Sequence, residues 1–440
     1  MLVRFISVIG CLLAGVGSFA QGVIDTTDRI SDTIQIASKS FAASAIPKPL
    51  EIKKNEGVAT FPWVQAVVIH HARNRNGGMY ETRATVTPKG DYLLMFPDGG
   101  HYGGSPVKTN DMLAYRSKDK GKTWTGPVVA FDIDYNQHGF IPFIPAGSTR
   151  MYAFGTQPIW GMYNRENGLQ ENAPIGYRYS DDDGYNWSEV RLIRPKNDST
   201  YRGMSVMRMT ETDKGTWILG THEGDWSYKP LITRQYILRS EDKGKSWTLL
   251  PGKRHGGWFV KGFDRMDEGR PINLGNDKVL IMLRTPEGHL WSSNSTDDGK
   301  TWTDPAPTPL VQPDAPPMLF KLSDNKTLIA FHHNRHHDQN YTGLSGTKVE
   351  LMKDRSELWF SLSTDDGKTW SEPRLFLVNA LAEGFQSAFR NYQCSYMDVF
   401  ADNGELHCFI PHRWERALYV HFKEADLKRF PTEKELLGKK

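Results

Sequence analysis

One eight-residue pattern recurs five times along this chain of 440 residues. Each copy begins with Ser, carries Asp at the third position and Gly at the fifth, and ends with Trp. The copies are 117–124, 180–187, 240–247, 295–302 and 363–370. Short Ser and Asp side chains hydrogen-bond nearby backbone amides, Gly permits a positive φ, and Trp buries a large ring. We therefore predict that each copy is a tight hairpin turn.

The copies are nearly evenly spaced, with 63, 60, 55 and 68 residues between successive serines. A short alternating segment leads into each copy and a second follows it. Further upstream lies another hairpin with its own turn, as in 84–95 and 318–329. Four short strands in about 60 residues are the content of one propeller blade. The 40 glycines, 25 prolines and 13 tryptophans also favour a turn-rich β protein over a helical bundle.

Five blades carry the pattern, and a sixth can be assembled near the C-terminus from Ser395–Phe400, Glu405–Ile410 and Leu418–Phe422. The N-terminal strand Val64–His70 would complete this blade, and closure by both chain ends removes free sheet edges. The sequence thus predicts an all-β, six-bladed β-propeller over residues 61–425, with seven blades as the alternative.

The segments outside the propeller have their own signals. Arg4 precedes an apolar stretch that ends in Ser18-Phe19-Ala20, which predicts a signal peptide over 1–20 and a secreted or periplasmic protein. Lipoprotein anchoring at Cys11 is the less favoured alternative, since the apolar segment before it is very short. We expect residues 21–60 to form a strap or linker and 426–440 a charged tail.

Composition excludes several classes of partner. The net charge is +3, from 54 basic and 51 acidic residues, and there is no basic tract of the kind that binds nucleic acid. No apolar run after residue 20 is long enough to span a membrane. We expect a monomer. After signal cleavage only Cys394 and Cys408 remain, either as a disulfide or as two buried thiols.

The five octets resemble the Asp-boxes, or BNR repeats, of the sialidase-like β-propeller superfamily, and the resemblance covers about residues 60–425. It implies that the boxes lie on the face away from the active site. The functional rim would then be made by the starts of first strands, the ends of second strands and the starts of third strands. Asp-boxes occur in hydrolases, lyases and non-catalytic receptors, so the activity must be argued from the site.

The resemblance also implies which residues a sialidase would use. Tyr80-Glu81-Thr82 stands where those enzymes carry Arg-Ile-Pro, and no Asp occurs from 99 to 110, where their acid is expected. Glu268 precedes Arg284 by about the family interval. Sialidases also hold the substrate carboxylate with arginines, and Arg284 and Arg355 match two of these. Tyr392 or Tyr396 matches the position of their nucleophile.

At equivalent positions of the predicted blades, basic and aromatic residues lie at one mouth of the ring. The ends of second strands are His101, Thr156, His222, Arg284, His333 and His412, and the starts of first strands are Tyr80, His138, Arg202, Glu268 and Tyr392. Loops add Tyr163, Glu223, Arg335 and Arg413. Because arginine pairs bidentately with carboxylate or sulfate, we predict that this rim binds an anionic ligand. By contrast, Arg116, Arg178 and Arg239 lie just before their octets and are interpreted as structural.

Histidine, tyrosine and arginine without an Asp acid suit β-elimination at a uronic acid. His101 and Tyr163 would be base and acid, with His138 as the rival base. The carboxylate or sulfate would be bound by Arg202, Arg284 and Arg355, with help from His222, His333, Tyr80 and Tyr392. This resembles the propeller-fold polysaccharide lyases that act on ulvan and related uronate glycans. The favoured hypothesis is a lyase, or a related oligosaccharide dehydratase, acting on an acidic poly- or oligosaccharide.

Two alternatives stay open. One is a hydrolase of the sialidase type that uses Glu268 with Tyr392 or Tyr396. The other is a non-catalytic propeller that stacks sugars on Trp160, Trp226 and Trp258. We expect no cofactor. A metal at 332–337 (His-His-Asn-Arg-His-His) is disfavoured, because adjacent histidines on a strand point to opposite faces.

Overall fold

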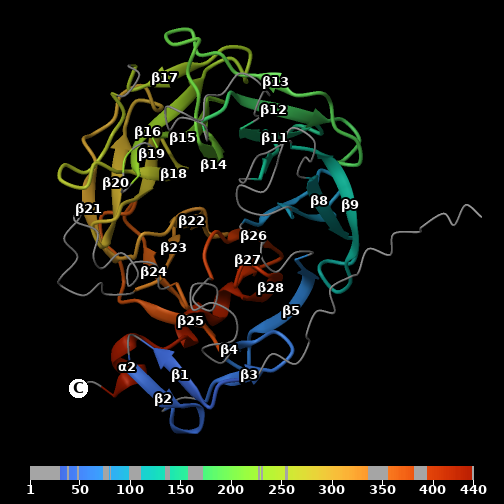
Figure 1. Ribbon diagram of the computed structural model, residues 1–440, viewed down its shortest axis with the longest axis vertical. Helices are drawn as coiled ribbons and strands as arrows, with labels where there is room; N and C mark the ends of the chain where they lie inside the picture. The colour runs from blue at the N-terminus through green and yellow to red at the C-terminus, as the bar shows by residue number, and fades with distance from the viewer. Residues whose placement is uncertain are drawn as a thin grey trace, which may run out of the picture.

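The computed structural model describes residues 30–36, 39–46, 49–72, 79, 81–98, 111–133, 139–156, 172–225, 228, 231–252, 256–334, 355–380 and 394–438. Within these residues, six antiparallel sheets stand around a common axis as the blades of a propeller (Figure 1). The first strand of each blade lies nearest the axis and the fourth lies at the rim. The prediction of six blades is therefore confirmed.

The first three blades follow one another in the sequence. Blade I contains β6 (Arg83–Val86), β7 (Tyr92–Pro97), β8 (Asp111–Ser117) and β9 (Thr125–Asp132). Blade II contains β10 (Ile141–Phe143), β11 (Met151–Thr156), β12 (Ile175–Ser180) and β13 (Arg191–Leu192). Blade III contains β14 (Ser205–Glu211), β15 (Trp217–Asp225), β16 (Ile232–Ser240) and β17 (Thr248–Leu250).

The last three blades complete the ring. Blade IV contains β18 (Asp267–Gly275), β19 (Lys278–Arg284), β20 (His289–Ser295) and β21 (Ala306–Val311). Blade V contains β22 (Met318–Lys321), β23 (Leu328–His332), β24 (Glu357–Ser363) and β25 (Arg374–Asn379). Blade VI contains β26 (Asp398–Asp402), β27 (Glu405–His412), β28 (Arg416–Lys423) and the N-terminal strand β5 (Gln65–His71). Since β5 pairs with β28, strands from both ends of the chain close the ring, as the sequence predicts.

The octets form the predicted turns between third and fourth strands. In the first, the Ser117 hydroxyl accepts a hydrogen bond from the Gly121 amide at 2.8 Å, and Asp119 accepts one from the Thr123 amide at 2.8 Å. The other four copies repeat both bonds. The glycine and the residue before it both have positive φ, 87° and 62° in the first copy. Glycine at the fifth position therefore relieves strain in a turn that already contains one left-handed residue.

Two of the arginines interpreted as structural join neighbouring blades. Arg116 of blade I donates to Asp183 in the octet of blade II, at 3.0 Å to the carboxylate. Arg239 of blade III donates to the Asp298 carbonyl at 2.8 Å and to its carboxylate at 2.9 Å, in the octet of blade IV. The octets thus hold both their own hairpin and the blade beside it.

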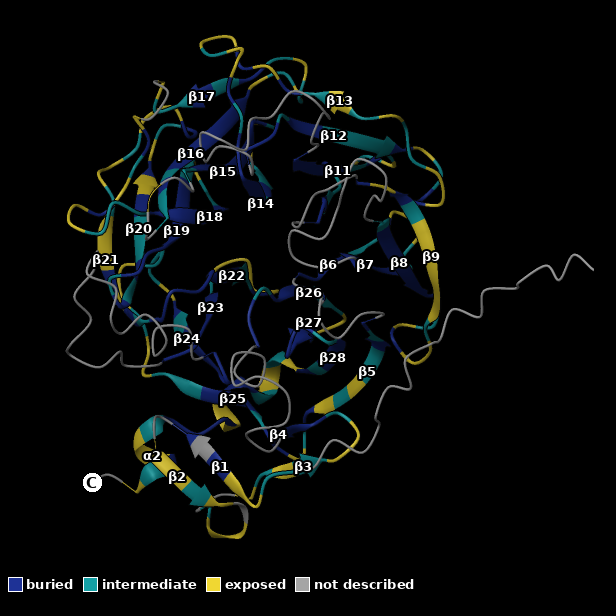
Figure 2. Cartoon of the chain, in the orientation of Figure 1, coloured by how far each residue is buried: buried dark blue, intermediate teal, exposed yellow. Residues whose placement is uncertain are grey.

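The core lies between the blades. Inner and middle strands are buried, whereas the fourth strands β9 and β21 expose much of their length (Figure 2). The largest cluster of buried apolar residues joins blades V and VI, and Cys394 and Cys408 lie within it as free, buried thiols. Of the two alternatives for these cysteines, the structure therefore has the buried thiols.

Both ends of the described chain pack on blade V. The strands β3 (Glu51–Lys53) and β4 (Val58–Thr60) extend its sheet beyond β25. The hairpin of β1 (Thr33–Ile36) and β2 (Lys39–Ala42), which precedes the short helix η1 (Ala43–Ala45), joins the same apolar cluster through Ile34 and Ile36. The C-terminal η4 (Glu424–Arg429) and α2 (Glu433–Leu437) contribute Leu427, Phe430 and Leu436. In the part of the chain that the structure describes, no helix is long and apolar enough to cross a membrane.

Candidate active site

A network of charged side chains lies at one mouth of the propeller, on the face opposite the octet turns. Glu268 is the second residue of β18, and Arg284 is the last residue of β19. Asp314 precedes β22, Arg355 precedes β24, and Tyr396 precedes β26. These are starts of first strands, the end of a second strand and the start of a third. The network therefore occupies the rim positions that the resemblance implied.

The centre of the network is a tyrosine hydrogen-bonded to a glutamate. The Tyr396 hydroxyl donates to Glu268 Oε1 at 2.8 Å. Arg284 Nη1 donates to the other oxygen of Glu268 at 2.6 Å and to the Tyr396 hydroxyl at 2.9 Å. Glu268 is buried, whereas Tyr396 is half-buried and is the more accessible partner. A phenol, a carboxylate and a guanidinium are thus in mutual contact.

The backbone at both members of this pair is in an unfavourable conformation. Glu268 has φ 51° and Tyr396 has φ 63°, in the left-handed region that side chains other than glycine rarely adopt. The register of β18 with β19 shifts between Asp267 and Arg270, so the ladder is irregular where Glu268 leaves it. Such strain persists only where surrounding contacts enforce it, and it gathers at functional sites.

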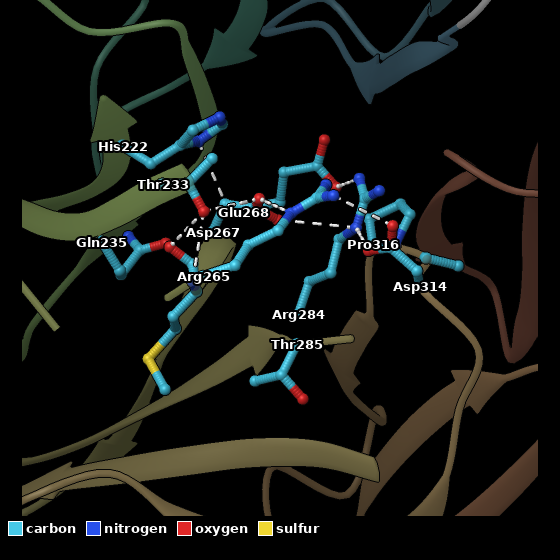
Figure 3. A network of polar contacts seen from close by, with 12 residues as sticks. His222, Thr233, Gln235, Arg265, Asp267, Glu268, Arg284, Thr285, Asp314 and Pro316 are labelled. Carbon is cyan, nitrogen blue, oxygen red and sulfur yellow. Dashed lines mark hydrogen bonds and ion pairs between the residues drawn. The ribbon is translucent and has the colours of Figure 1, made fainter. Parts of the chain in front are cut away.

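Arg284 is held from two sides, which fixes the plane of its guanidinium group. Its Nε donates to Asp314 Oδ1 at 2.8 Å and lies 3.5 Å from Asp267 Oδ1, while Nη1 faces Glu268 (Figure 3). The same Nη1 also contacts the Tyr396 hydroxyl. Arg265 bridges the same two aspartates, at 2.8 Å to Asp267 and 3.0 Å to Asp314. Because the bonding groups are buried or nearly so, these charge-assisted bonds are stronger than their surface counterparts.

Arg355 completes the network from the side of blade V. Its Nη1 donates to the Ser395 hydroxyl at 3.1 Å, its Nη2 donates to the Asp314 carbonyl oxygen, and its guanidinium lies 5.7 Å from the centre of the Tyr396 ring. Three arginines, 265, 284 and 355, therefore face three carboxylates, 267, 268 and 314. The network is close to neutral, and an added anion would find the guanidinium groups of Arg284 and Arg355 near Tyr396.

The environment sets the protonation states of the central groups. Burial raises the pKa of Tyr396 well above its usual value and the charge of Glu268 raises it further, whereas Arg284 and Arg355 lower it. Burial also raises the pKa of Asp314, but Arg265 and Arg284 outweigh it and hold that pKa well below its usual range. At neutral pH Tyr396 is therefore a phenol whose proton is shared with an adjacent carboxylate.

The structure brings together four of the residues singled out from the sequence, namely Glu268, Arg284, Arg355 and Tyr396. Of the two tyrosines considered as nucleophile, it is Tyr396 that contacts Glu268, and Tyr392 lies outside the described residues. His222 borders the network: its Nδ1 lies 3.4 Å from the backbone amide of Glu268 and from the Ser205 hydroxyl. His222 is buried, so it contacts the backbone that carries Glu268.

Other rim residues occupy different settings. Thr156 and His412 are the last residues of β11 and β27, and His333 directly follows β23, close to the expected strand ends. All three are buried. His333 donates from Nδ1 to the Glu357 carbonyl at 2.7 Å, and burial next to Arg413 lowers the pKa of His412 to about 3. Arg202 is half-buried just before β14. Substrate binding by these residues stays a prediction.

Several candidates fall outside the part of the chain that the structure describes. They include the acid and base of the elimination hypothesis, whose roles stay predictions. The residues are Tyr80, His101, His138, Tyr163, Arg335, Tyr392, Trp160 and Trp226.

Sequence reasoning missed Asp267, Asp314 and Arg265, which orient Arg284. A signal for Asp314 existed, because it lies just before the first strand of blade V, a blade for which no first-strand residue was named. Among the described residues, no group of three or more His, Cys, Asp or Glu could hold a metal ion. His332 contacts Val311 and Ser361 through its two ring nitrogens, and burial lowers its pKa to about 4.

Comparisons with known proteins agree with the architecture. The family described as BNR repeat-like domain matches residues 151–408, more than half of the chain. No curated protein matches the sequence.

Among solved structures, the chain is similar to the Hadza microbial sialidase Hz136, with 18% identity, a TM-score of 0.58, and 83% of this chain and 69% of that chain covered. A protein of unknown function from Dyadobacter fermentans gives 14% identity and a TM-score of 0.58, with 83% and 100% covered. The intramolecular trans-sialidase from Ruminococcus gnavus, in complex with oseltamivir carboxylate, gives 15% identity and a TM-score of 0.54, with 82% and 98% covered. At such identities these similarities show the fold alone.

Proposed function

The chain belongs to the BNR repeat-like domain family, and we propose that it is a carbohydrate-active enzyme that hydrolyses the glycosidic bond of an acidic sugar. The observation that carries the proposal is the 2.8 Å hydrogen bond from Tyr396 to Glu268, with Arg284 bonded to both. A nucleophile, its base and a group that stabilises the resulting charge are the parts that covalent catalysis requires.

In the first step the Tyr396 oxygen attacks the anomeric carbon, and its proton passes to Glu268 along the existing hydrogen bond. The bond from the anomeric carbon to the leaving-group oxygen breaks, and that oxygen takes a proton from water. In the second step a water oxygen attacks the same carbon and loses a proton to solvent, while the Tyr396 oxygen departs and recovers its proton from Glu268. Two displacements give net retention of configuration.

A tyrosine paired with a base suits an acidic sugar for an electrostatic reason. A carboxylate nucleophile would approach a substrate that is itself negatively charged, and the two charges would repel each other. Tyr396 is neutral until the proton moves, because burial and Glu268 raise its pKa. Arg284 and Arg355 lower that pKa, so they favour the phenolate that forms when the glycosyl–tyrosine bond breaks.

The arginines also supply the site for the acidic group of the sugar. Arg284 and Arg355 lie on either side of Asp314, and Arg355 faces the Tyr396 ring. Guanidinium groups recognise carboxylates bidentately, and burial strengthens the attraction. Two of the structurally similar proteins are a sialidase and a trans-sialidase, so a sialoside is the first substrate to try.

The leaving group is the demanding part of this reaction. The segment 99–110 contains neither Asp nor Glu, although the resemblance implies an acid there. An enzyme without a strong acid at the leaving oxygen depends on how well that oxygen carries negative charge. We therefore propose that aryl glycosides with acidic phenols are cleaved much faster than alkyl glycosides or oligosaccharides.

Elimination remains a prediction from the sequence, since its proposed acid and base lie outside the described residues. The signal peptide predicted over 1–20 would place the enzyme where extracellular glycans are degraded, and we include secretion in the proposal.

The test compares Tyr396→Phe with Tyr236→Phe on a panel of fluorogenic aryl sialosides and aryl uronides. Tyr236 is a matched control, because its hydroxyl donates to Glu223 at 2.9 Å in the core of blade III. We expect hydrolysis by the wild type and by Tyr236→Phe, and its loss in Tyr396→Phe. The growth of unsaturated-uronate absorbance with uronate glycans, unaffected by Tyr396→Phe, would overturn the proposal in favour of a lyase.

A further inference from the structure

Two arginines reach the axis of the propeller from opposite blades. Arg83 belongs to β6 in blade I and Arg270 to β18 in blade IV, and both side chains are almost completely buried. Arg270 Nη1 donates to the Met397 carbonyl at 3.2 Å, and Arg83 Nη2 donates to Glu81. Since Met397 follows Tyr396 in the sequence, the pair lies directly beneath the Tyr396–Glu268 site.

Most of the donors of this pair have no acceptor. Arg83 Nε and Nη1, together with Arg270 Nε and Nη2, are buried and make no hydrogen bond to any residue. An unsatisfied buried donor destabilises the folded protein, and the cost is higher when the group is charged. Four such nitrogen atoms on two neighbouring cations are too many to attribute to loose packing.

The charges along the axis do not balance. The charged groups that act most strongly on Arg270 are Arg83, Asp398, Arg208 and Glu81. Together with Arg270 itself, three guanidinium groups face two carboxylates, which leaves one positive charge. Burial, and after it the charge of Arg83, lowers the pKa of Arg270 to about 9. At neutral pH the guanidinium is still protonated, so the excess charge remains.

A cavity on the octet side of the ring borders two of the charged groups that act on Arg270. This cavity, of about 560 Å³, lies on the axis, lined by first strands of five blades and the turns that follow them. Arg208 and Asp398 form part of its wall and are joined by an ion pair of 3.0 Å. Both act electrostatically on Arg270, and Arg208 is 26% exposed. A small solute could therefore approach from the face opposite the candidate active site.

We infer that a small monovalent anion of the halide class, chloride under physiological conditions, binds on the axis at Arg83 and Arg270. One negative charge neutralises the excess, whereas a divalent phosphate or sulfate would reverse it. A large halide also loses its hydration more cheaply than fluoride or a carboxylate, which matters at a buried site beside the Met318 sulfur. This site is separate from the arginines assigned to the substrate, and its occupancy does not depend on the proposed reaction.

The direct test is anomalous diffraction from wild-type crystals grown with bromide in place of chloride. We expect a bromide peak within hydrogen-bond distance of the guanidinium groups of Arg83 and Arg270. Bromide peaks on the molecular surface alone would overturn the inference. A diffraction readout does not require activity, so failure of the proposed hydrolysis would leave this result independent.

A second test measures Tm at constant ionic strength while chloride replaces fluoride. A ligand that binds only the folded state raises Tm steadily with the logarithm of its concentration above its Kd. We expect this rise in the wild type and in Arg178→Met, a control arginine that lies over the Phe131 ring at 5.0 Å. In Arg270→Met we expect the dependence to vanish. Equal slopes in all three proteins would contradict the inference.

Discussion

Replacing Tyr396 by Phe and Glu268 by Gln, singly and together, tests whether the two side chains act as one catalytic unit. A positioned general base contributes about 10²- to 10⁴-fold to a rate, which corresponds to about 3–5 kcal/mol of activation free energy. We expect each single variant to lose at least about 10²-fold in kcat on an aryl glycoside. The double variant should lose little more, because groups that work in one step are not additive.

The structure predicts a much smaller effect on stability. Tyr396→Phe removes one bond of 2.8 Å to Glu268 and one of 2.9 Å from Arg284, but these two partners keep their own bond of 2.6 Å. The cost should be about 1–3 kcal/mol of unfolding free energy. Tyr236→Phe, which loses a comparable bond to Glu223, should cost a similar amount and retain its activity.

The assay is a kcat and KM determination with the best aryl glycoside, together with urea unfolding of each variant. Single losses that multiply in the double variant would show that Glu268 and Tyr396 act in separate steps. Retention of more than about a tenth of wild-type kcat by either single variant would refute the assignment of base and nucleophile.

Three further outcomes are expected. Arg355→Lys should raise KM for an acidic aryl glycoside at least about tenfold, with a smaller change in kcat, because lysine cannot replace a bidentate guanidinium; an unchanged KM would remove Arg355 from the substrate site. Arg239→Gln should lower the unfolding free energy by about 3 kcal/mol and leave kcat unchanged, since it breaks a buried ion pair with Asp298 on the octet face. A loss of kcat in this variant would contradict the assignment of the octet face to structure and of the opposite face to catalysis. Hydrogen bonds from the Thr123 and Thr369 side chains and amides hold the pKa of Asp119 and Asp365 at about 2 in the folded state, below the unfolded value of about 4. The stabilisation that these two carboxylates give to the folded state is therefore complete above about pH 4 and is lost as the pH falls from about 4 to 2. Measuring the midpoint of urea unfolding at successive pH values will detect this loss.

The fold could be predicted in detail because its signals are local and repeated. Each octet fixes a hairpin through contacts within eight residues, and their spacing fixes the number of strands between them. The closing strand β5 could also be predicted, because an open ring would leave two free sheet edges. The additional strands β3 and β4 on blade V could not, since β4 pairs with β25 from more than 300 residues away, β3 pairs only with β4, and neither strand carries the repeat.

The site could be predicted only in part, for a physical reason. Glu268 and Arg284 belong to one blade, so their spacing in sequence reflects their spacing in the hairpin. Tyr396 and Asp314 come from other blades, and their contacts with Arg284 span 112 and 30 residues. Sequence alone left Tyr392 and Tyr396 as equal candidates. Tyr396 has a left-handed backbone conformation, which cannot be predicted from its residue type, and its hydroxyl contacts Glu268.

The most direct test of the central claim is to trap the covalent intermediate. The wild type would be incubated with an activated fluoro-glycoside of an acidic sugar, digested, and analysed by mass spectrometry. The account predicts a glycosyl adduct on the peptide that contains Tyr396, absent from Tyr396→Phe and present in Tyr236→Phe. Turnover of the substrate with no adduct on Tyr396, or an adduct on another side chain, would contradict it.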